Sequence, residues 1–263
     1  ARRSAFRSSN RPAMVFALAV IVLCGVAFAS LMYGAITLSL GEAWSGLTSE
    51  SDVFARNVVW QIRFPRVVDA MFVGASLAAA GALLQGVTRN PLADPTILGV
   101  TAASGLASAA VIVANPQVPQ WGIAMACTAG GLGGAGILYV IAWRGAVSPV
   151  RLALAGVALS AFFGAAIVGL LSSSRTFLQT SLGFLAGGMY GSEWRDFRAM
   201  LPYAAPGLIG AFLLAGRLNV LALGDDVAAG LGVLTDRTRL LVLAVVGILT
   251  AAALSVAGLV RFV

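Results

Sequence analysis

The sequence predicts an all-α fold of membrane-spanning helices, and three observations support this prediction. Hydrophobic residues make up 59% of the chain and charged residues only 10%, with a mean hydropathy of +0.94. A soluble domain carries about 25% charged residues, so this chain has too little polar material to cover a surface that faces water. Its charge-free stretches are long enough for helices of about 20 residues, the length that crosses a bilayer. These stretches lack the period-2 alternation of a membrane barrel, so the spans are expected to be helices.

Charge-free windows place seven spans along the chain. The long uncharged stretch 95–143 exceeds one helix, and the sequence at 115–120 divides it in two because its prolines remove backbone donors and clash with the preceding turn. The other five windows each hold one span. They lie at 13–33, 70–88, 152–174, 199–216 and 240–260.

The arginines indicate how these spans are oriented. Four of them precede the first span, which predicts a cytoplasmic N-terminal tail over 1–12. Alternation then places further arginines on the same side, and they outnumber those on the other: Arg89, Arg144, Arg151, Arg217, Arg237 and Arg239. The sequence pI of 10.7 could suggest a nucleic-acid partner, but the charges are dispersed between spans rather than gathered in one patch. The lipid bilayer is therefore the expected partner, and nucleic acid is not.

Few motifs point to metal or cofactor chemistry. The sequence contains no histidine, and Cys24 and Cys127 lie within apolar spans, so no metal site is expected. The stretch GGLGGAG at 130–136 contains G-x-G-x-x-G, but neither a strand nor a suitably spaced acidic residue accompanies it. Close helix packing at Gly130 and Gly134 explains it better. We therefore expect the chain to bind no cofactor, ATP included.

Three polar segments interrupt the apolar pattern. In RNPLADPTILG at 89–99 the two prolines should end one helix and start the next, and Asp94 should cap the first turn of the third span. In the segment 34–66, Arg63 and Arg66 flank Pro65, either as anchors at the lipid head groups or as contacts for an acidic partner. The segment 217–239 should contain a short surface helix that serves as a connector or as a docking element.

Three blocks in order carry a resemblance to a known family. They are RFPRVVDAMFVGASLAAAGALLQGVTRNPLADPTILGVTAASG at 63–105, VSPVRLALAGVALS at 147–160 and LNVLALGDDVAAGLGV at 218–233. The chain resembles the FecCD-type permeases, the membrane subunits of ABC importers for iron–siderophores, haem and cobalamin. The resemblance implies the type II ABC importer permease fold, with a single transmembrane domain over 13–263. The family has about ten spans, of which seven to eight are expected here, so the sequence is expected to lack the C-terminal two to three helices.

The resemblance also implies roles for individual residues. Arg63 and Arg66 become the pair that docks a substrate-binding protein. The loop 217–239 becomes the coupling-helix loop that contacts the partner ATPase through Leu223, Gly224, Asp225, Asp226, Ala228, Ala229, Gly230, Leu231 and Gly232. The cytoplasmic gate is expected at Asn90, Leu92, Ser148 and Pro149. Arg261 is a candidate for the substrate pathway or for an interfacial anchor.

The function that this resemblance implies is ATP-driven import across the bacterial cytoplasmic membrane. The chain would be a multi-pass permease subunit and not an enzyme, paired with a second permease, two ATP-binding subunits and a substrate-binding protein. ATP and magnesium would bind the partner ATPase. A ferric siderophore is the expected substrate, with haem or cobalamin as alternatives. A secondary transporter driven by an ion gradient is the alternative from another class, and it requires an ionisable group inside the membrane, for which Asp69 is the nearest case.

Overall fold

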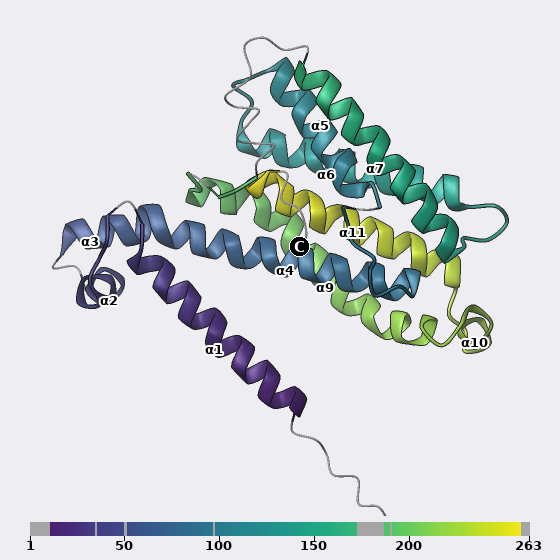
Figure 1. Ribbon diagram of the computed structural model, residues 1–263, viewed down its shortest axis with the longest axis horizontal. Coiled ribbons are helices and arrows are strands. Elements are labelled where there is room, and N and C mark those ends of the chain that lie inside the picture. Colours follow the sequence, from purple (N-terminus) through teal and green to yellow (C-terminus); the bar gives the residue numbers. More distant parts are fainter. Residues whose placement is uncertain are drawn as a thin grey trace, which may run out of the picture. The chain divides into compact units, whose positions relative to one another are not determined.

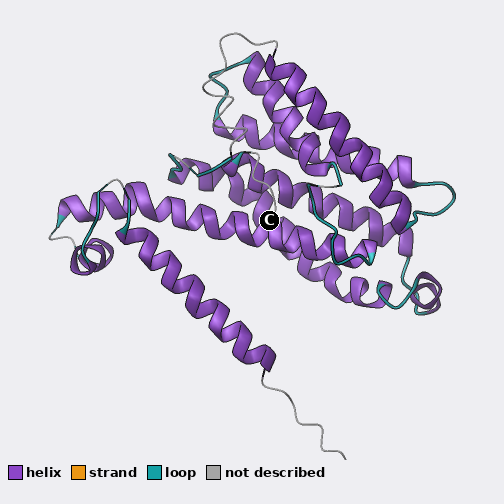
Figure 2. Cartoon of the chain, in the orientation of Figure 1, coloured by secondary structure: helices purple, strands orange, loops and turns teal. Residues whose placement is uncertain are grey.

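The computed structural model describes residues 11–258 apart from 35, 50–51, 97, 173–186 and 190. Within these residues every regular element is a helix, and loops join the helices (Figure 2). The predicted all-α membrane fold is confirmed. The elements are α1 (Arg11–Met32), α2 (Leu40–Thr48), α3 (Val53–Asn57), the π-helix η1 (Val58–Arg63), α4 (Phe64–Thr88), α5 (Val100–Ala114), α6 (Gln120–Ala142), α7 (Pro149–Ser172), α9 (Trp194–Leu221), α10 (Asp225–Gly230) and α11 (Thr235–Ala257).

Six helical segments in the described residues are long and apolar enough to cross a membrane. They are Ala13–Met32, Val53–Thr88, Gln120–Ala142, Pro149–Ser172, Trp194–Leu221 and Thr235–Ala257. The third predicted span differs, because α5 has only 15 residues. At about 1.5 Å per residue this helix rises ~22 Å, less than the ~30 Å of a bilayer's hydrocarbon core. The loop that holds Pro91 and Pro95 continues to Gly99, so α5 starts later than the charge pattern predicts.

The second predicted span also differs, because its helix begins well before residue 70. α3, η1 and α4 follow one another without a break from Val53 to Thr88. The helix widens into π geometry over Val58–Arg63, which ends two residues before Pro65. Proline has no N–H to donate to the preceding turn, and a π-helical stretch accommodates that missing hydrogen bond without ending the helix. Pro65 therefore lies inside a helix rather than at the end of a loop.

The chain divides into two compact units, Ala1–Val67 and Val68–Val263. The first unit has its own apolar core, in which Leu31 and Leu38 pack with Val58 and Val59. In this unit α2 starts with a capping box, since Ser39 accepts from the backbone N–H of Glu42 while Glu42 accepts from that of Ser39. The hydrogen bonds from Ser39 lower the pKa of Glu42.

The second unit is built around α11, the most buried of the candidate spans. α11 packs against α6 and α5 and, on another side, against α9 (Figure 1). Glycines let α6 approach its neighbours closely: a Cβ on Gly131 would lie 2.6 Å from the carbonyl oxygen of Gly247 in α11, and one on Gly130 would lie 2.6 Å from that of Ala103 in α5. A Cβ on Gly134 would also meet Ala103. The predicted packing role of Gly130 and Gly134 is confirmed.

The segment 89–99 enters the second unit from the end at which α6 finishes and α7 begins. Gly134 faces Val100 at the start of α5, about two helical turns, or ~12 Å, before α6 ends at Ala142. The hydroxyl of Ser160, well inside α7, donates to the carbonyl oxygen of Thr96 at 2.7 Å. Asp94 accepts from the backbone N–H and the hydroxyl of Thr96. The prediction that Asp94 caps α5 is therefore wrong, because Gly99 occupies the N-cap position and Asp94 stabilises the turn before it.

Candidate functional site

Asp225 lies at the centre of a charged cluster formed by three segments of the second unit. Nη2 of Arg239, in α11, donates to both carboxylate oxygens of Asp225, at 2.8 and 3.0 Å. Arg89, directly after α4, forms a second ion pair with the same carboxylate. Asp225 is the first residue of α10, so one carboxylate joins the short helix to both α4 and α11.

Arg239 extends this cluster to the loop before α7. Its side chain is only 1% exposed, and its Nη1 donates to the carbonyl oxygen of Val147 at 2.6 Å. The backbone N–H of Val147 donates to Asp236, also in α11, at 3.2 Å. A bridge between Val147 and Trp143 closes the loop around Gly145, whose φ of 79° favours glycine. The start of α11 thus holds both backbone groups of Val147.

Arg89 adopts a backbone conformation that side chains other than glycine rarely take. Its φ is 53°, and among the described residues no other non-glycine residue has a positive φ. The left-handed region costs an L-residue about 1–2 kcal/mol. The side chain compensates by donating from Nε to the carbonyl oxygen of Leu221 at 3.0 Å and by pairing with Asp225. Such strain, held by specific contacts, is typical of functional sites.

The electrostatics of the cluster favour an ionised Asp225. Partial burial alone would raise the pKa of Asp225, but the hydrogen bonds and charge of Arg239, and then those of Arg89, outweigh it. The pKa of Asp225 therefore lies below its usual value, as expected for a carboxylate between two guanidinium groups. The cluster is a charged link that persists at neutral pH.

α10 has an inner and an outer side. Ala228 is fully buried in the apolar core of its own chain, and Asp225 faces Arg89 and Arg239. Val227 in the helix, Leu223 before it and Leu231 directly after it are all exposed, and together they are called the apolar stripe here. Asp226, Ala229, Gly230 and Gly232 are also exposed. Gly224 and Gly232 flank the helix with φ of 123° and 81°, so the two turns that present α10 require glycine.

The four predicted gate residues form two separate pairs, one on the loop after α4 and one at the start of α7. Asn90 accepts from the backbone N–H of Leu92 at 3.0 Å, which leaves Leu92 with 80% of its surface exposed. Pro149 is the first residue of α7, and the carbonyl of Ser148 accepts from Leu152 at 3.0 Å. No hydrogen bond between described residues joins the two pairs directly. The cluster joins their neighbours instead, since Arg89 precedes Asn90 and Val147 precedes Ser148.

Arg63 and Arg66 both line a cavity of about 210 Å³ in the first unit, together with residues such as Tyr33 and Ile62. Arg63 is only 7% exposed, and its guanidinium donates to the backbone carbonyls of Leu31 and Ile36. Arg66 is exposed. The predicted docking pair thus divides into a buried arginine that holds its own chain and an exposed one. The third arginine singled out from the sequence, Arg261, lies outside the described residues.

Comparison with known proteins adds the family. Residues 19–263 match the FecCD transport family. The chain belongs to this family. This assignment agrees with the resemblance that the sequence carries in its three ordered blocks.

Several FecCD-type relatives are clearly similar to the chain. The iron(3+)-hydroxamate import system permease protein FhuB of Bacillus subtilis is 36% identical over 95% of the chain, and the chain covers 66% of FhuB. The Fe(3+)-citrate import system permease protein YfmD of the same organism is 36% identical over 99% of the chain and is covered to 78%. The cobalamin import system permease protein BtuC of Halobacterium salinarum is 40% identical over 80% of the chain and is covered to 57%.

A solved structure matches the fold of this FecCD-family chain. It is an ABC transporter of the metal-chelate type in an inward-facing conformation, with a TM-score of 0.79 and 29% sequence identity. The match covers 94% of the chain and 76% of that structure's chain. The predicted permease fold is therefore confirmed, and the chain is a multi-pass membrane protein.

Sequence reasoning missed three members of the site in this FecCD-family chain. Val227 shares the spacing of Leu223 and Leu231, and a count of apolar residues at every fourth position would have included it. Sequence reasoning used Arg89 and Arg239 only to predict how the spans are oriented in the membrane. Their pairing with Asp225 joins residues 136 and 14 positions apart, and charge identity alone does not indicate which acid an arginine meets.

Proposed function

We propose that the chain is the transmembrane permease subunit of an ATP-driven importer that receives a ferric siderophore from a substrate-binding protein. The names of the relatives support this proposal, because iron(3+)-hydroxamate, Fe(3+)-citrate and cobalamin import permeases are all similar to the chain. The iron chelates outnumber cobalamin among these names, so ferric siderophore import is preferred over import of cobalamin or haem. The chain itself performs no catalysis and binds no nucleotide; ATP and magnesium belong to the partner ATPase.

The observation that carries the mechanism is the link from α10 to both gate loops through Asp225. A displacement of α10 acts on Arg89 and Arg239 through one ionised carboxylate. Arg89 pulls on the loop of Asn90 and Leu92, and Arg239 pulls through the Val147 carbonyl on the loop of Ser148 and Pro149. Because protein interiors are closely packed, a small movement at one end of such a link is transmitted rather than absorbed. ATP-driven motion would in this way open and close the gate.

The ATPase contact is assigned to the outer side of α10. The exposed apolar stripe of Leu223, Val227 and Leu231 suits a groove on the partner, as a short amphipathic helix does in helix-in-groove recognition. The remaining exposed residues of the coupling segment flank this stripe: Asp226, Ala229, Gly230 and Gly232. Gly224, Asp225 and Ala228 support α10 from within, and the ATPase engages the outer side.

The substrate-binding protein is proposed to dock at Arg66, with acidic groups as its complement. Arg63 positions this surface by holding the carbonyls of Leu31 and Ile36. Docking on this side implies a cytoplasmic N-terminus and a bacterial cytoplasmic membrane location. Two permease subunits, identical or related, and two ATP-binding subunits would complete the transporter.

Reconstitution tests this function. Proteoliposomes that hold the chain's full-length transporter, with its ATPase and binding protein, should accumulate a radiolabelled ferric hydroxamate or ferric citrate only when ATP is supplied. Uptake of labelled cobalamin or haem under the same conditions, without uptake of the iron chelates, would reassign the substrate and keep the mechanism. Uptake that needs a proton gradient and no ATP would refute the proposal.

One observation favours the alternative of an ion-coupled transporter. Asp69 in α4 is fully buried, and neither of its carboxylate oxygens has a hydrogen-bond partner in the described part of the chain. An ionisable group inside a membrane helix is a typical element of an ion pathway. Asp69→Asn separates the two functions, because it would abolish gradient-driven uptake and leave ATP-driven uptake in place.

A further inference from the structure

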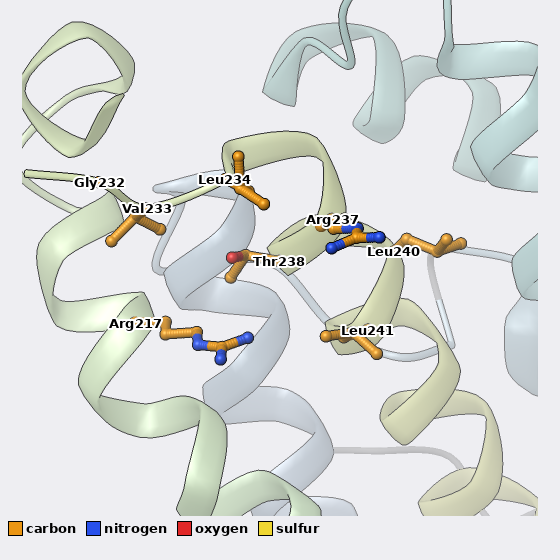
Figure 3. A pocket seen from close by; sticks show the side chains of 8 residues that line it. All are labelled: Arg217, Gly232, Val233, Leu234, Arg237, Thr238, Leu240 and Leu241. Atoms are coloured by element: carbon orange, nitrogen blue, oxygen red, sulfur yellow. The ribbon is translucent and has the colours of Figure 1, made fainter. Parts of the chain in front are cut away.

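A second cavity lies apart from the charged cluster, between the end of α9 and the start of α11. It has a volume of about 440 Å³, and its walls come from Arg217 in α9, from the turn Gly232–Leu234 and from the first two turns of α11 (Figure 3). Both arginines in its wall, Arg217 and Arg237, are exposed. Neither forms an ion pair or hydrogen bond with any residue that the structure describes. The cavity therefore presents two positive charges that no described residue pairs with.

Two further features of the cavity point to an anion. Arg237 lies in the first turn of α11, where the helix dipole already disfavours a cation, and no side chain caps this helix. Thr238 is only 1% exposed and lines the cavity, yet its hydroxyl has no hydrogen-bond partner in the described residues. Figure 3 shows the Thr238 side chain between those of Arg217 and Arg237 in this view. A bound phosphate would satisfy the two arginines and the hydroxyl together.

The rest of the cavity wall is apolar and continues along a membrane-spanning helix. Leu240 and Leu241 line the cavity and remain partly exposed on α11, which is one of the candidate spans. Leu234 adds an exposed apolar side chain at the start of that helix. A soluble phosphate would leave this apolar surface in water, whereas a phospholipid would cover it with acyl chain. Basic residues at the end of a membrane helix, next to an apolar wall, are the combination that lipid head groups recognise.

We propose that this cavity binds an anionic phospholipid, with the phosphate on Arg217, Arg237 and Thr238 and an acyl chain along Leu240 and Leu241. The site shares α11 with the charged cluster and joins α9 to the segment that follows α10. A bound lipid would therefore bridge the two helices that flank α10. This proposal is independent of the transported substrate, because it requires only that the chain lies in a bilayer.

Native mass spectrometry of the intact transporter, released from nanodiscs that contain phosphatidylcholine and phosphatidylglycerol, tests the proposal. The double variant Arg217→Gln/Arg237→Gln should retain phosphatidylglycerol about tenfold less than the unaltered protein, since each arginine near an anionic lipid contributes a severalfold preference. Arg144→Gln is the matched control, because Arg144 is an exposed arginine outside the cavity. Equal retention by the double variant, or an equal loss in the control, would overturn the proposal.

Two further arms identify the source of the phosphate. Short-chain phosphatidylglycerol should raise the melting temperature of the detergent-solubilised protein, and glycerol phosphate, which lacks acyl chains, should not. An equal rise with glycerol phosphate would make this a plain anion site and refute the lipid. Retention measured with the ATPase removed should match that of the full complex. If lipid binds only after the ATPase is removed, the cavity belongs to the ATPase interface and the proposal fails.

Discussion

Asp225 and Arg239 hold each other across the base of α10: one guanidinium nitrogen lies 2.8 Å and 3.0 Å from the two carboxylate oxygens. The arginine is buried and the aspartate is partly exposed, so the pair lies at the edge of the core rather than within it. The same carboxylate also pairs with Arg89. The carboxylate of Asp225 therefore links α10 to the end of α4 and, through Arg239, to the loop before α7.

Removing this side chain should damage the fold more than removing its exposed partner. Asp225→Ala leaves Nη2 of the buried Arg239 without an acceptor and should cost about 2 kcal/mol of stability. Arg89→Ala removes a partly exposed ion pair and the hydrogen bond to the Leu221 carbonyl, together worth about 1 kcal/mol, and alanine keeps the left-handed strain. Melting temperatures of the solubilised protein should rank the variants in that order. Both variants should lower uptake per ATP hydrolysed, and unchanged coupling in both would contradict the proposed link between α10 and the gate.

The stability of the cluster should depend on acidity. The folded pKa of Asp225 lies below its usual value, so the ionised group stabilises the folded state above about pH 4, and this contribution is lost as the pH falls through the folded pKa. Acidification should therefore lower the melting temperature of the unaltered protein more than that of Asp225→Asn. Glu42, whose pKa is also lowered, is present in both proteins and cancels. Parallel profiles would show that Asp225 is not held ionised.

The close crossing of α6 and α11 should tolerate no added methyl group at Gly131. A Cβ there would lie 2.6 Å from the Gly247 carbonyl oxygen, so Gly131→Ala must separate the helices at a cost of about 1–3 kcal/mol. Gly133→Ala in the same helix is the control, because a Cβ at that position meets nothing within 4 Å. It should leave the melting temperature unchanged or raise it through the helix propensity of alanine. Equal losses in the two variants would mean that α6 is sensitive to any substitution here.

The two arginines that flank Pro65 should respond differently to charge reversal. Arg66→Glu should weaken binding of the substrate-binding protein about tenfold or more at low salt, with little change in melting temperature. Arg63→Glu should lower the melting temperature, because its guanidinium holds the carbonyls of Leu31 and Ile36. Arg198→Glu, at an exposed position of α9, controls for the change in net charge. Binding can be followed by surface plasmon resonance on nanodiscs. If Arg66→Glu binds as tightly as the control, docking lies elsewhere.

The sequence predicts most helices correctly because apolar windows and prolines act locally. The spans at 13–33, 152–174 and 240–260 fall on α1, α7 and α11 within a few residues. Proline is also where prediction fails. The charge pattern starts the second span at residue 70, after Pro65, whereas a π-helical stretch carries the helix through this proline. Local pattern does not distinguish these outcomes, and the π-helical stretch contributes Val58 and Val59 to the apolar core of the first unit.

The candidate site is less accessible to sequence reasoning. Asp225 is recognisable as a helix start, but its partners come from distant segments, and only the folded packing brings Arg89 and Arg239 to it. Ala228 is chemically as suitable for a partner contact as Ala229, and burial alone separates them. Residue type therefore identifies the segment, while the direction of each side chain has to come from the structure.

The late start of α5 leaves part of the route beside α7 to backbone that is not helical. Asp94 and Thr96 lie in this part, and the carbonyl oxygen of Thr96 accepts from Ser160, well inside α7. Irregular backbone is stable inside a bilayer only when protein or water satisfies its polar groups, and Asp94 and Ser160 supply part of that here. A substitution that removes either side chain therefore leaves a backbone group in search of another partner, a cost that a regular helix, which satisfies its own backbone, does not incur.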